Sequence, residues 1–91
     1  MVKVSMQIAC PRGLEPRPIA ELVQVASKYD SRVYLETENK RVNAKSIMGM
    51  MSLDLDNGDF VMISADGRDE EEAMQELQSF MTSHLNMAKV G

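Results

Sequence analysis

The sequence predicts an α+β fold in which a four-stranded antiparallel sheet is covered on one face by three helices, in the order β-α-β-β-α-β-α. Short segments alternate apolar and polar residues, which is typical of strands with one buried face. Other segments repeat apolar residues at helical spacing. Such a sheet needs cover on its apolar face only. The 91 residues allow one core, so we expect a single domain over residues 1–91.

The first half of the chain predicts three strands and one helix. Residues 2–8 and 33–37 alternate as strands, and residues 38–40 form a turn into a short returning strand at 41–43. Between the first two strands a helix begins at the prolines near residue 16, where a missing N–H is tolerated. Its buried face comprises Ile19, Leu22, Val23, Ala26 and Tyr29.

The second half predicts two helices and one strand. A short helix covers residues 46–53, and the Asn57-Gly58 pair marks a tight turn before a strand at 61–65. Asp69 opens a last helix whose acidic first turn suits the positive helix end. Its buried stripe comprises Ala73, Leu77, Phe80 and Met81. Three methionines fit an ordinary core: Met6, Met62 and Met81. Residues 86–91 are expected to be a frayed tail.

Composition excludes several function classes. No apolar run reaches the roughly 18 residues of a membrane span, and the alternating N-terminus is unlike a signal peptide, so we expect a cytoplasmic protein without membrane contact. Cys10 and His84 are single residues of their kinds, which predicts no disulfide, metal site or cofactor. A net charge of -4 disfavours direct nucleic-acid binding. Partners are expected to be proteins.

Two segments resemble the signatures of the HPr phosphocarrier family of the bacterial sugar phosphotransferase system. The segment from Gly13 to Ala20 is similar to the family's G-L-H-A-R-P-A-A, whose histidine carries a phosphoryl group, and Arg41 to Leu53 resembles the family's regulatory segment. Glu15 occupies the histidine position, whereas Ser46 matches the regulatory serine. The resemblance is greatest to the catabolite-repression branch of bacilli, which lacks the histidine. It implies the family's open-faced β-sandwich and a protein that is not an enzyme.

Glu15 precedes the first predicted helix, where free N–H groups and the helix dipole favour an anion. The same environment makes the carboxylate less nucleophilic, and its phosphate would be an acyl phosphate. We therefore interpret Glu15 as a fixed anion and helix cap, with a partial likeness to phosphohistidine as a further possibility. Pro16 also replaces the family's usual alanine.

Arg17 matches the family's arginine beside the active site. Its planar guanidinium suits a carboxylate or phosphate. Sequence physics alone equally allows a local ion pair with Glu15 or Glu21. The resemblance favours contact with a partner.

Ser46 is predicted to be the N-cap of the short helix, a position for which serine is well suited. Its surroundings, Asn43 to Gly49, resemble the segment recognised by HPr kinase/phosphorylase, so the resemblance implies phosphorylation of Ser46. The two roles are compatible, because the added charge lies at the positive helix end.

The short helix is rich in apolar residues: Ile47, Met48, Met50 and Met51. So small a helix cannot bury them all, and we expect some to form an exposed, adaptable protein-binding patch. The resemblance assigns partner contact to this helix, and we select Ile47, Met48 and Met51 together with Arg17.

The resemblance implies a regulator of carbon catabolite repression. On this resemblance we expect HPr kinase/phosphorylase to phosphorylate Ser46 and the product to act as corepressor of a catabolite control protein of the LacI/GalR repressor type. No phosphoryl group is expected to pass to sugar, because Glu15 takes the place of the family's histidine. Two alternatives stay open: a phosphocarrier component that uses Glu15 or another residue, and an inert paralogue with the same fold.

Overall fold

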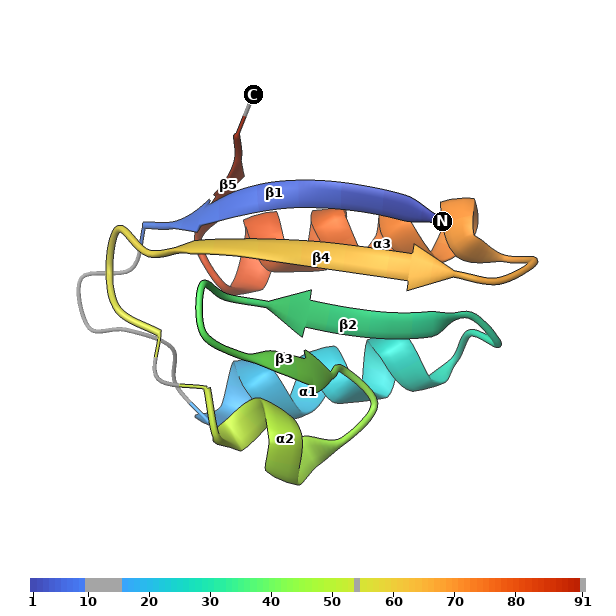
Figure 1. Cartoon of the computed structure of the whole chain (residues 1–91), viewed down its shortest axis with the longest axis horizontal. Coiled ribbons are helices and arrows are strands. Elements are labelled where there is room, and N and C mark those ends of the chain that lie inside the picture. Colours follow the sequence, from blue (N-terminus) through green and yellow to red (C-terminus); the bar gives the residue numbers. More distant parts are fainter. Residues whose placement is uncertain (10–15, 54, 91) are drawn as a thin grey trace.

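The computed structural model describes residues 1–9, 16–53 and 55–90. Its helices and strands follow the predicted order and add one strand: β1 (Val2–Ile8), α1 (Pro16–Ser27), β2 (Arg32–Glu36), β3 (Arg41–Asn43), α2 (Ile47–Met51), β4 (Phe60–Asp66), α3 (Glu70–His84) and β5 (Met87–Lys89). Within the described residues these strands form one antiparallel sheet in the order β3-β2-β4-β1-β5. Figure 1 shows α1 and α3 running along one face of that sheet. The predicted α+β class and the helical cover are confirmed.

The register of the strands places the buried apolar side chains on one face of the sheet. Met6 of β1 lies opposite Val61 of β4, and Leu35 of β2 lies opposite Ile63. All four side chains are buried. The helices complete the core with buried side chains of their own: Ile19, Leu22, Val23, Ala26, Ala73, Met74, Leu77 and Met81. Residues one position out of phase lie on the other face, which no helix of the described residues covers (Figure 1).

The expectation of a frayed tail over residues 86–91 is wrong. Asn86 adopts a positive φ of 51°, and the chain then returns to pair with β1 as the edge strand β5, with Met87 opposite Ile8. Met87 is only 2% exposed, and Leu85 before it is also buried. This strand is too short to show a readable alternation, and burial of the Leu85 and Met87 side chains holds it in place.

The expectation that Met62 belongs to the core is also wrong. Met62 is half-buried and lies across from Ser5 of β1 and Glu36 of β2. Val61 and Ile63 beside it are buried against the helices, so Met62 must point to the opposite face. Met6 and Met81 are buried as predicted.

Tyr29 differs from its predicted place on the first helix, because α1 ends at Ser27. Tyr29 is half-buried, and its hydroxyl donates to the Glu76 carboxylate of α3. Lys28 donates to the same carboxylate at 2.5 Å. The hydrogen bond to Glu76 is the main reason why the pKa of Tyr29 rises to about 12. These contacts tie the end of α1 to α3.

Asp69 immediately precedes α3, as predicted, but its side chain forms hydrogen bonds with the loop before β2 and not with α3. Its carboxylate accepts hydrogen bonds from the backbone N–H groups of Asp30 and Ser31, each at 2.9 Å, and from the Ser31 hydroxyl. The bond from the Ser31 hydroxyl contributes most to holding the pKa of Asp69 below its usual value. The start of α3 is thereby fixed against the loop before β2.

We expect Gly67→Ala to lower the free energy of unfolding by about 1–3 kcal/mol. A Cβ at Gly67 would lie 2.7 Å from the Cα of Ser31, a fully buried residue. Backbone atoms cannot move aside as a flexible side chain would. Urea denaturation followed by circular dichroism measures the loss.

Gly49→Ala is the matched control for this substitution. A Cβ at Gly49 would lie 3.4 Å from its nearest neighbour, Ser46 Oγ, which is an ordinary van der Waals distance. In a helix alanine is favoured over glycine by up to about 1 kcal/mol. Gly49→Ala should therefore be as stable as the parent or more so, and equal stability of Gly67→Ala and the parent would contradict the prediction.

Candidate functional site

Ser46 lies at the start of α2 and caps it. Its backbone is extended, with φ -104° and ψ 113°. Its Oγ accepts a hydrogen bond from the Gly49 N–H at 3.2 Å, and its carbonyl accepts the first helical bond from the Met50 N–H at 2.9 Å. The predicted capping role is confirmed. Ser46 is half-buried, so part of its surface faces solvent.

A hydrogen-bonded turn leads into Ser46. Asn43 Oδ1 accepts from the Lys45 N–H at 2.8 Å, and the Asn43 carbonyl accepts from the Ser46 N–H at 3.0 Å. The Lys45 side chain donates to the carbonyl of Tyr29 at 2.6 Å. Lys45 thus links the segment before Ser46 to the chain that follows α1. Sequence analysis missed this contact, since no pattern in the sequence signals a bond to a distant carbonyl.

Three apolar side chains project from α2 into solvent, and we call them the α2 patch: Ile47, Met48 and Met51. Their exposed fractions are 47%, 82% and 44%. Met50, by contrast, is 1% exposed and joins the core. The prediction that so short a helix would leave some of these residues exposed is confirmed. The α2 patch therefore begins one residue after Ser46.

Arg17 lies in the first turn of α1, the helix that packs beside α2 (Figure 1). Its side chain is almost fully exposed, and its Nε lies 3.6 Å from the Glu21 carboxylate. This is the local ion pair that the sequence allowed, and at such exposure it adds little stability. Arg17 is therefore accessible to a partner. Glu15 and the side chain of Pro16 lie outside the described residues.

Other candidate chemistries find no support in the described part of the chain. Residues 1–9, 16–53 and 55–90 contain no group of three His, Cys, Asp or Glu side chains placed to hold a metal. Over the same residues no helix is both long and apolar enough to cross a membrane. His84 stacks on Phe80 with ring centroids 4.5 Å apart. Cys10 lies outside the described residues.

Comparisons with known proteins define the class to which this fold and site belong. The model of a family described as the PTS HPr component phosphorylation site matches residues 2–83. In overall fold the chain is similar to the crystal structure of HPr-C-His from Thermoanaerobacter tengcongensis. The TM-score is 0.85 at 46% identity, and the match covers 94% of this chain and 97% of that one. The chain belongs to the HPr family.

Within that family the chain is similar to HPr-like proteins called Crh. It is 43% identical to the protein from Bacillus subtilis over 85 residues, covering 93% of this chain and all of the relative. It is 41% identical to the protein from Halalkalibacterium halodurans over 81 residues, covering 89% of this chain and 96% of the relative. Proteins of this family act as phosphocarriers and through contacts with partner proteins, rather than as catalytic enzymes.

Proposed function

We propose that this protein is a cytoplasmic regulator of carbon catabolite repression, controlled by phosphorylation of Ser46. The main support is the combination of two positions: Glu15 stands where the family has its phosphorylated histidine, whereas the regulatory serine is kept as the N-cap of α2. A chain with the serine but without the histidine can be phosphorylated at the regulatory position and lacks the residue that carries the phosphoryl group in the family.

A phosphoryl group on Ser46 should alter the surface more than the fold. The Gly49 N–H, which now donates to Ser46 Oγ at 3.2 Å, would have a phosphate oxygen as an equivalent acceptor. The group adds about 1.5 to 2 negative charges. Because the α2 patch follows immediately, one surface would then combine a strong anion with exposed apolar area.

The proposed partners are HPr kinase/phosphorylase, which modifies Ser46, and a catabolite control protein of the LacI/GalR type, which binds the product. Ile47, Met48 and Met51 supply the apolar contacts, and Arg17 supplies an accessible guanidinium on the neighbouring helix. Likeness to the Crh proteins supports this choice of pathway.

A second candidate is a phosphocarrier component of the sugar phosphotransferase system. The observation in its favour is the matching family model, described as a phosphorylation site, which spans Glu15. A carboxylate can accept a phosphoryl group as an acyl phosphate. This candidate requires Glu15 or another residue to be nucleophilic, and the place of Glu15 before a helix opposes that role.

We expect HPr kinase/phosphorylase and ATP to add one phosphoryl group to this protein, and Ser46→Ala to abolish the addition. Intact-mass spectrometry measures incorporation. Ser52→Ala is the control, because Ser52 lies at the other end of α2 and its hydroxyl donates to the Gly49 carbonyl at 2.6 Å. Phosphorylation of Ser46→Ala at the parent's rate would show that another residue is the target.

A further inference from the structure

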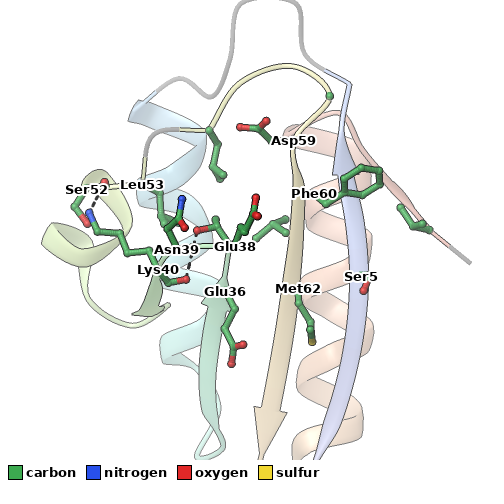
Figure 2. A pocket seen from close by; sticks show the side chains of 15 residues that line it. Ser5, Glu36, Glu38, Asn39, Lys40, Ser52, Leu53, Asp59, Phe60 and Met62 are labelled. Carbon is green, nitrogen blue, oxygen red and sulfur yellow. Dashed lines mark hydrogen bonds between the residues drawn. The ribbon is translucent and has the colours of Figure 1, made fainter.

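The face of the sheet opposite the helices contains a groove that the regulatory site does not use. It runs between the turn joining β2 to β3 and the segment entering β4, as Figure 2 shows. Its volume is about 960 Å³. We call it the sheet groove and define it by six of its lining residues: Glu36, Glu38, Lys40, Asp59, Phe60 and Met62.

Apolar side chains lie at one end of this face. Phe60 is 59% exposed, and Met62 on the same strand is half-buried. Further along β4 the residue on the same face is Ser64, which lies between Lys3 of β1 and Tyr34 of β2. The guanidinium of Arg41 stacks on the Tyr34 ring at 4.0 Å. On this face of the sheet, the exposed aromatic side chain of Phe60 therefore lies at the groove. Its ring faces solvent and is not part of the core.

The rim of the groove is acidic. Glu36, Glu38 and Asp59 line it, and Glu36 forms an ion pair with Arg41, whose Nε lies 3.3 Å from the carboxylate. Neither Glu38 nor Asp59 forms an ion pair with another of the described residues. Both residues are exposed.

Among the described residues, Lys40 forms no ion pair with this rim. It is the one basic side chain among the lining residues that the structure describes. Its ammonium group donates instead to the Ser52 carbonyl at 3.1 Å, at the end of α2 (Figure 2). The groove thus presents two carboxylates without a cationic partner above an apolar floor.

We propose that the sheet groove binds a basic segment of a partner protein. Cationic side chains of that segment pair with Glu38 and Asp59, and an apolar side chain between them packs on Phe60 and Met62. The volume suits a few residues of peptide. Opposite charge across an interface selects the partner and speeds its approach. This interaction is separate from Ser46 and does not depend on the proposed regulatory function.

The test uses a fluorescent peptide of alternating arginine and leucine, with a peptide of alternating glutamate and leucine for comparison. Fluorescence anisotropy should show binding of the basic peptide at least roughly tenfold tighter than that of the acidic one. Glu38→Lys with Asp59→Lys should weaken binding of the basic peptide at least roughly tenfold, and Phe60→Ser should weaken it several-fold. Circular dichroism verifies that each variant is folded.

The matched control is Glu71→Lys with Glu72→Lys, which makes the same change of charge at exposed residues of α3. It should change affinity by less than about twofold. Equal losses in both double variants would mean that net charge alone attracts the peptide, and equal binding of the acidic peptide would overturn the proposal. So would amide chemical-shift changes confined to residues 47–51 instead of 36–40 and 58–62. Sedimentation in which Phe60→Ser converts a dimer to a monomer would assign the groove to a second copy of this chain and also overturn it.

Discussion

Incubation with phosphoenolpyruvate and the general phosphotransferase enzyme I is expected to transfer no phosphoryl group to this protein. This expectation rests on the proposed function, in which Glu15 takes the place of the histidine of family carriers. An imidazole nitrogen is a good nucleophile near neutral pH, whereas a carboxylate before a helix is stabilised as an anion and would yield only a labile acyl phosphate. Intact-mass spectrometry, with a histidine-containing HPr as the positive control, measures incorporation.

Glu15→His is the informative variant for this result, and we expect it to restore only partial transfer. The proline ring at position 16 restricts the backbone of the residue before it, whereas the resemblance implies an alanine there in family carriers. Adding Pro16→Ala should raise transfer further. A stoichiometric, hydroxylamine-sensitive phosphate on the parent that vanishes in Glu15→Gln would contradict the first expectation. Full transfer by Glu15→His alone would show that Pro16 has no effect.

Periodicity predicted most of the fold because each long segment has one apolar face. The alternation over residues 2–8 and the helical spacing from Ile19 to Ala26 indicate which side chains are buried. The strand at 87–89 escaped detection because a single buried residue, Met87, defines its inner face. The spacing of Tyr29 fits the predicted helix, but α1 ends two residues earlier, at Ser27. The Tyr29 hydroxyl instead donates a hydrogen bond to Glu76 of α3.

The exposure of the α2 patch could be predicted from geometry. A short helix has only one inner face, which cannot bury all four of its large apolar side chains. The sheet groove could not be predicted in this way, because its walls include the turn after β2 and the segment entering β4, and no pattern in the sequence indicates that these two segments lie close together. A signal was nonetheless present. Phe60 is two residues before Met62 in β4 and is out of phase with the buried Val61 and Ile63. The alternation of a strand therefore places Phe60 and Met62 together on the outer face.

Phosphorylation of Ser46 is expected to raise affinity for the catabolite control protein at least roughly tenfold, or about 1.4 kcal/mol. The phosphate supplies strong acceptors for basic residues of the repressor. The α2 patch supplies apolar area that would be buried in the complex, and Arg17 adds a charged donor from α1. Neither part suffices alone, because an exposed anion binds basic surfaces without selectivity and the apolar patch is present in both forms. Calorimetry on the modified and unmodified proteins measures the difference.

The contribution of each part can be separated by matched substitutions in the phosphorylated protein. Met48→Ala and Arg17→Ala should each weaken the complex by about 1 kcal/mol, roughly fivefold in Kd, without slowing phosphorylation. Val90→Ala and Arg68→Ala remove comparable exposed groups away from α2 and should leave affinity unchanged. Equal affinity of the two forms would exclude the phosphate as the switch. An unchanged Met48→Ala would instead exclude the patch while leaving the phosphate in place, because the two contributions come from different atoms of the same surface.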